Sequence, residues 1–107
     1  MTPAAAGLRD FLAALVRAAL MADADGVLWI EEARRLRAGL DPEALGHRDG
    51  PWKSAVAEAE RPEDRPAERR VSLTLPAACP LDAADLAPSG PSVEALVDRL
   101  RGSAGTG

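Results

Sequence analysis

The stretch from Leu8 to Leu20 constrains the fold more than any other part of the chain. Its large apolar residues recur every three to four positions, the spacing at which side chains share one face of an α-helix. Arg9, Asp10, Ala13 and Arg17 fall on the other side of such a helix. The apolar face consists of Leu8, Phe11, Leu12, Leu15, Val16, Ala19 and Leu20. This pattern predicts an amphipathic helix that buries one side against other elements.

A second helix is predicted from about Trp29 to Ala38. Glutamates in its first turn and arginines in its last turns complement the helix dipole at both ends. Between the two helices, Gly26 is expected to adopt the left-handed conformation that ends the first one. The apolar stripe of the second helix is Trp29, Ala33, Leu36 and Leu40. Two helices joined by a short loop are expected to pack as an antiparallel hairpin.

After Leu40 the helical patterns become short and weak, and they are followed by a charged segment and a strand pattern. Asp41 and Pro42 predict a short helical turn, and a weak helix is predicted from Trp52. The stretch "RPEDRPAERR", residues 61–70, has two prolines and no large apolar residue, which predicts an exposed linker or loop. Val71, Leu73 and Leu75 alternate with polar residues and predict one short strand, which needs a partner strand to be stable.

The last predicted element is an amphipathic helix that begins after Ser92 as its cap and stops at Gly102. Its apolar face consists of Val93, Leu96, Val97 and Leu100. The expected fold is therefore mainly α-helical, with an N-terminal helical hairpin, short helices, a charged linker, one short strand and a C-terminal amphipathic helix. The expected regions are a helical part at 1–60, the linker at 61–70, the strand plus helix at 71–101 and a flexible tail at 102–107.

Composition narrows the function classes. A chain of 107 residues is one domain at most, and one Phe, two Trp and no Tyr leave the core to Leu and Val. Small domains with few large side chains are marginally stable alone, which favours a protein that docks on another protein or on a copy of itself. The net charge of −4 without a long basic run speaks against nucleic-acid binding.

No apolar run is long enough to cross a membrane, and Asp10 and Arg17 interrupt what a signal peptide would keep apolar. We therefore expect a cytoplasmic protein. Cys79 is the single cysteine, so no internal disulfide is expected, and its default role is a small buried side chain. His47 is the single histidine, and the sequence offers no catalytic constellation, so no enzyme is expected.

The stretch "ADADGVLWIEE", residues 22–32, has the spacing of a cation-binding loop. An EF-hand loop needs oxygen ligands at its first, third and fifth positions, glycine at the sixth, an apolar anchor at the eighth and glutamate at the twelfth. The corresponding residues are Met21, Asp23, Asp25, Gly26, Leu28 and Glu32. A thioether at the first position is a poor ligand for a hard cation. An ordinary turn between two helices is the leading interpretation, and a partner-facing acidic loop is a third one.

This stretch also resembles the acidic loop of TerB-like domains, a small all-helical family associated with tellurite resistance and stress responses. Those domains carry an A-x-ADG stretch followed, six residues after the Gly, by a Glu that opens the next helix. The matching residues are Ala22, Ala24, Asp25, Gly26 and Glu32. The likeness covers about the first third of the chain, and the linker and strand after Arg61 depart from the family's plan. It implies a helical bundle with a metal-binding acidic loop.

The function predicted from the sequence is that of a non-catalytic accessory or adaptor subunit of a bacterial cytoplasmic assembly, bound to another protein or to copies of itself. One predicted contact is strand addition through Val71, Leu73 and Leu75. The other is the apolar face of the last helix, formed by Val93, Leu96, Val97 and Leu100. The alternative is a cation-responsive module that binds calcium weakly through Asp23, Asp25 and Glu32, and no other cofactor is expected.

Overall fold

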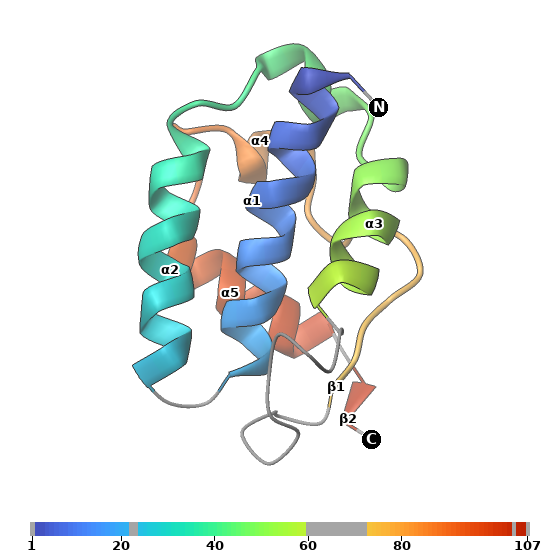
Figure 1. Cartoon of the computed structure of the whole chain (residues 1–107). Helices are drawn as coiled ribbons and strands as arrows, with labels where there is room; N and C mark the ends of the chain where they lie inside the picture. The colour runs from blue at the N-terminus through green and yellow to red at the C-terminus, as the bar shows by residue number, and fades with distance from the viewer. Residues whose placement is uncertain (1, 22–23, 60–72, 104, 107) are drawn as a thin grey trace.

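Helix α1 (Pro3–Leu20) lies in the middle of the protein and packs against α2 (Ala24–Arg37), α3 (Asp49–Ala59) and α5 (Val93–Ser103) (Figure 1). The structure is a computed structural model that describes residues 2–21, 24–59, 73–103 and 105–106. Thr2 caps α1, because its side-chain oxygen accepts a hydrogen bond from the Ala5 amide at 3.1 Å, and a proline follows at the first helical position.

Helix α1 is buried on more sides than its sequence pattern predicts. From residue 11 to residue 20 only Arg17 is not fully buried. Ala13, which the periodicity assigns to the polar side, is 1% exposed, so that assignment is wrong. Because helices pack on several sides of α1, only a narrow strip of this helix faces solvent. The small side chain of Ala13 lets a neighbouring helix approach closely.

Helices α1 and α2 form the predicted antiparallel hairpin (Figure 1), but its turn differs from the prediction. Helix α1 ends at Leu20, and α2 begins at Ala24, well before Trp29. Gly26 therefore lies inside α2, and its φ is not positive. A Cβ atom at Gly26 would lie 2.9 Å from the carbonyl oxygen of Met21. Glycine is needed here because the two helices approach closely, and not because the chain turns left-handed.

The inner stripe of α2 agrees with the sequence. Ala33 is fully buried, Leu40 is 9% exposed, and Trp29 and Leu36 pack partly against the core. The Arg17 guanidinium of α1 lies over the Trp29 ring, 4.6 Å from its centroid, which is a cation–π arrangement. The stripe therefore fixes which side of α2 faces α1 and which side faces outward.

The middle of the chain holds a short 3-10 helix, η1 (Pro42–Gly46), and α3. Asp41 caps η1 as predicted, with its side chain accepting a hydrogen bond from the Glu43 amide at 3.0 Å. Helix α3 begins at Asp49, before the predicted start at Trp52. Trp52 is 1% exposed, and its indole N–H donates to the carbonyl oxygen of Pro76 at 3.0 Å. This side chain anchors both α3 and a segment distant in sequence to the core.

Two short strands, β1 (Leu73–Thr74) and β2 (Gly105–Thr106), pair antiparallel, with Leu73 opposite Thr106 and Thr74 opposite Gly105. Each strand has only two residues, whereas the helices contain most of the described residues. The protein is therefore mainly helical, as predicted. Val71 and the linker 61–70 lie outside the described residues. Helix α5 continues to Ser103, so Gly102 does not stop it, and the segment expected to be a flexible tail contributes β2. No helix in the described ranges is both long and apolar enough to cross a membrane.

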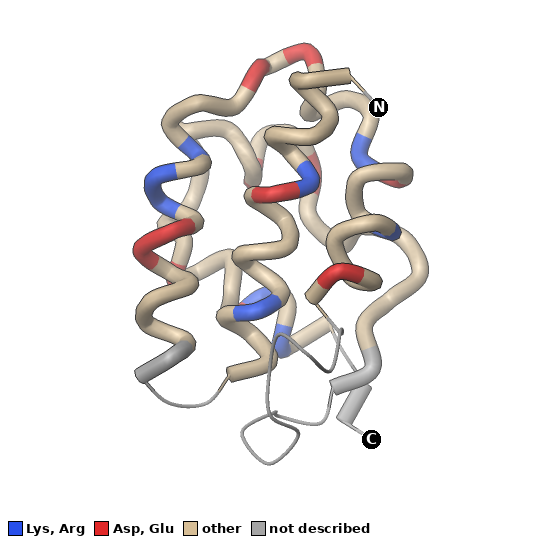
Figure 2. Tube along the Cα trace, in the orientation of Figure 1, with Lys and Arg blue, Asp and Glu red and all other residues tan. Residues whose placement is uncertain are grey.

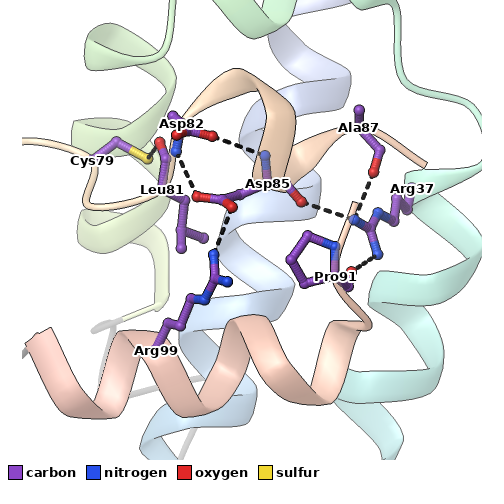
Figure 3. Close-up of polar contacts among 8 residues, drawn as sticks. All are labelled: Arg37, Cys79, Leu81, Asp82, Asp85, Ala87, Pro91 and Arg99. Atoms are coloured by element: carbon purple, nitrogen blue, oxygen red, sulfur yellow. Dashed lines mark hydrogen bonds and ion pairs between the residues drawn. The ribbon is translucent and has the colours of Figure 1, made fainter. Parts of the chain in front are cut away.

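Arg37, the last residue of α2, ties this helix to residues 85–91 (Figure 3). Its side chain is 7% exposed and donates to the carbonyl oxygens of Pro91 at 2.5 Å, Ala87 at 2.6 Å, Asp85 at 2.8 Å and Leu86 at 3.4 Å. Burial lowers the pKa of this guanidinium. A guanidinium is planar and weakly hydrated, so a set of carbonyl oxygens can replace its water shell.

Helix α4 (Ala83–Leu86) is held by a reciprocal capping box (Figure 3). The Asp85 amide donates to the Asp82 side chain at 2.9 Å, and the Asp82 amide donates to the Asp85 side chain at 3.1 Å. Asp85 also accepts from the Arg99 guanidinium of α5 at 2.5 Å. The Asp82 amide and then Arg99 hold the pKa of the Asp85 carboxyl below its usual range.

This capping box predicts a specific sensitivity to acid. Because the pKa of Asp85 is lowered by folding, its stabilising effect is present above the ordinary aspartate pKa and is lost as the pH falls through the lowered value. We expect the difference in melting temperature between the natural protein and Asp85→Asn to shrink from about pH 5 to about pH 2. The control is Asp98→Asn, which removes an exposed carboxylate from the same helix as Arg99. An equal pH-dependent difference for both variants would contradict the assignment.

Candidate functional site

The side of α2 that faces away from α1 carries exposed apolar side chains. Val27 and Leu28 are 58% and 67% exposed, and they are the large apolar residues that the described part of the chain leaves exposed. The EF-hand interpretation places Leu28 in the core as the apolar anchor of the loop. That part of the interpretation is wrong, because α2 begins early enough to turn Leu28 outward.

We call the six exposed residues on this side the outer face of α2. They are Val27, Leu28, Glu31, Arg34, Arg35 and, in the turn after the helix, Ala38. Four of them, Leu28, Glu31, Arg35 and Ala38, follow one another at spacings of three, four and three residues. This spacing places them in one stripe along the helix, opposite the buried Ala33.

The charges on this part of α2 occur in an acidic pair followed by a basic pair (Figure 2). Glu31 and Arg34 lie 2.5 Å apart, and Glu32 forms an ion pair with Arg35. Arg34 also lies 2.6 Å from Glu94 of α5. The hydrogen bond with Arg35 lowers the pKa of Glu32, and Glu94 raises the pKa of Arg34. Exposed ion pairs contribute little stability, so these groups can exchange partners readily.

A hollow of about 220 Å³ lies between the amino-terminal end of α2, the end of α1 and α5. Ala18, Met21, Val27 and Ile30 line it on one side, and Glu94, Val97, Asp98 and Arg101 on the other. The Arg101 guanidinium is occupied there, donating to the carbonyl oxygens of Ala18, Ala19 and Met21 at 3.1 Å each. Ligand pockets usually have about 300–1,000 Å³, so this hollow is smaller than a typical small-molecule site.

The structure does not place Asp25 and Glu32 as an EF-hand loop would place two of its ligands. Asp23 lies outside the described residues, and Asp25 lies in the first turn of α2. Glu32 is seven residues further along the same helix, a rise of about 10 Å, and pairs with Arg35. An EF-hand loop instead wraps its ligands around one centre. Among the described residues no group of three or more His, Cys, Asp or Glu could hold a metal ion. Calcium binding by the acidic stretch stays a prediction from the sequence.

The predicted partner face of α5 is used inside the protein. Leu96 and Leu100 are fully buried, and Val97 and Val93 are 2% and 3% exposed. Periodicity identified the apolar side correctly, but the chain itself covers that side, so the prediction that a partner binds there is wrong. Of the predicted strand contact, Val71 lies outside the described residues, the backbone of Leu73 pairs with β2, and Leu75 packs partly against the core.

Among the described residues, Cys79 and His47 belong to no reactive arrangement. The Cys79 thiol is half-buried and donates to the carbonyl oxygen of Leu81 at 3.4 Å (Figure 3). Burial raises the pKa of this thiol, which keeps it protonated and unreactive at neutral pH. His47 is exposed at the end of η1.

Comparison with known proteins finds no matching family model, no matching curated protein and no matching solved structure. The resemblance to TerB-like domains therefore stays a prediction. What the described residues offer as a candidate site is a surface, the outer face of α2, with its apolar end beside a shallow hollow.

Proposed function

We propose that the protein is a small non-catalytic accessory or adaptor subunit that binds a partner protein through the outer face of α2. The observation that supports this function is the exposure of Val27 and Leu28 side by side on a helix whose other large apolar residues pack against the core. Adjacent exposed apolar residues with charged neighbours are typical of protein-binding surfaces. The placement in a bacterial cytoplasmic assembly stays a prediction from the sequence.

The chemistry around this face fits a protein partner better than a small molecule. Glu31, Arg34 and Arg35 flank the apolar end with both signs of charge, which gives a partner protein the means to set orientation and register. The apolar residues are few, so the expected binding energy is modest and concentrated at Leu28, the more exposed of the two.

Site-specific photo-crosslinking tests this function in cells that make the full chain. A photoreactive phenylalanine analogue placed at Leu28 is expected to capture a protein of defined mass, and Val27→Asp in the same chain is expected to reduce the yield several-fold. The matched control is the same analogue at Glu43, which is also exposed but lies on η1. Equal yields from positions 28 and 43, or an undiminished yield with Val27→Asp, would contradict the proposed surface.

A further inference from the structure

We propose that a second copy of the chain is the protein that covers the outer face of α2, with the two α2 helices packed antiparallel about a two-fold axis. The inference rests on the proposed function, because it uses the same face and names its partner. It follows from the order of apolar, acidic, basic and small residues along the exposed stripe.

This order is self-complementary around Ala33. Leu28 comes five residues before Ala33 and Ala38 comes five residues after it, while Glu31 and Arg35 come two residues before and after. In an antiparallel pair whose axis passes at the level of Ala33, residues equally distant from Ala33 meet across the interface. Leu28 of each copy then faces Ala38 of the other, and Glu31 of each copy faces Arg35 of the other.

The charges select this arrangement over its alternatives. A parallel pair in register would place Glu31 against Glu31 and Arg35 against Arg35, and like charges in contact across an interface are unfavourable. The antiparallel pair places opposite charges together twice. In the single chain Glu31 pairs with Arg34 and Arg35 pairs with Glu32, both on the exposed surface. The cross-chain pair therefore exchanges exposed contacts for other exposed contacts, which costs little, and Arg34 keeps its contact with Glu94.

The sizes of the apolar residues also match. A large side chain, Leu28, meets a small one, Ala38, with Gly39 beside it, so the helix ends can approach closely. The contact is short, because α2 has 14 residues and a length of about 21 Å. Stable dimers bury about 800 Å² per partner, more than one such helix provides, so we expect a weak and concentration-dependent dimer.

Disulfide trapping tests both the contact and its direction. In a Cys79→Ala background, Leu28→Cys and Ala38→Cys chains are mixed under mild oxidation, and a covalent heterodimer is expected. Either variant alone is expected to cross-link at least about tenfold less, because identical positions lie about 15 Å apart along the antiparallel pair. Glu43→Cys, mixed with Leu28→Cys, gives the background from random collisions.

Charge exchange tests the register independently. In a Cys79→Ala background, one chain carries Leu28→Cys and Ala38→Cys, with Glu31→Arg or Arg35→Glu added. Either charge variant alone places like charges together and is expected to lower the cross-linking yield about tenfold. Mixing the Glu31→Arg chain with the Arg35→Glu chain restores opposite charges at both contacts, so the yield is expected to recover. Circular dichroism checks that every chain is folded.

The outcomes separate this inference from the proposed function. Cross-linking of Leu28→Cys alone as strong as that of the mixture, no yield above the Glu43→Cys background, or no recovery on mixing the charge variants would overturn the antiparallel pair. If the pair fails while the photoreactive analogue at Leu28 captures a different protein, the adaptor function stands with another partner. If the analogue captures no protein at all, both proposals fail.

Discussion

Replacing Arg37 with alanine is expected to lower the free energy of unfolding by about 3 kcal/mol. The Arg37 guanidinium supplies hydrogen bonds to four backbone carbonyl oxygens in residues 85–91, and it has no carboxylate partner among the described residues. Without it, these carbonyl groups lose the guanidinium donor in a largely buried place, although the Ala87 carbonyl keeps its hydrogen bond from the Gly90 amide, and the contact between α2 and α4 opens. Urea denaturation followed by circular dichroism measures the effect.

Two further substitutions separate geometry from charge. Arg37→Lys keeps a positive charge but has one compact donor group in place of a planar fork, so it is expected to recover only a minor part of the loss. Arg35→Ala removes an exposed arginine two residues away and is expected to leave the denaturation midpoint almost unchanged. If Arg35→Ala destabilised the protein as much as Arg37→Ala, the role assigned to the buried guanidinium would be wrong.

Gly90→Ala is expected to destabilise the protein by about 2 kcal/mol, the second largest effect. A Cβ atom at Gly90 would lie 2.7 Å from the carbonyl oxygen of Asp85, closer still to that of Ala84, and 3.0 Å from a nitrogen of Arg37. Two of these neighbours are backbone atoms of α4, so the segment itself must shift. The shift pulls carbonyl oxygens away from Arg37.

The control for Gly90→Ala is Gly46→Ala, since nothing lies within 4 Å of a Cβ atom at Gly46 and its φ is not positive. We expect this control to be neutral or slightly stabilising, because alanine reduces the freedom of the unfolded chain. The double variant Gly90→Ala with Arg37→Ala is expected to lose less unfolding free energy than the sum of the two single losses, because both substitutions act on the same segment. Full additivity in urea denaturation would show that Gly90 and Arg37 act separately.

Local patterns in the sequence predicted the elements well. The spacing from Leu8 to Leu20 predicted α1, Asp41 with Pro42 predicted η1, and the apolar face of the last helix predicted the buried side of α5. The same patterns do not show which neighbouring element packs on a given side of a helix. Ala13 and the α5 face are buried because neighbouring helices lie there, and the contacts of Arg37 join residues about fifty positions apart.

The sequence does not predict the candidate face, because the pattern of "ADADGVL" indicates a turn between two helices. Once Gly26 is placed inside α2, Val27 and Leu28 fall opposite the stripe of Trp29, Ala33 and Leu36. A helical projection that began at residue 24 would have shown this. The early start goes with a tight connection in which Gly26 lies against the Met21 carbonyl, a backbone geometry that the residue types do not specify by themselves.

The burial of α1 has a consequence for the synthesis of the protein in the cell. Helix α1 leaves the ribosome before the elements that cover it. Helix α5 packs against α1, and its Arg101 donates to the last carbonyl groups of α1, but it leaves the ribosome more than eighty residues later. At ordinary rates of translation this interval is on the order of ten seconds. Throughout that time part of the apolar surface of α1 is exposed, because α5 is not yet there to bury it. The nascent chain is therefore expected to need protection of this apolar helix until α5 has left the ribosome.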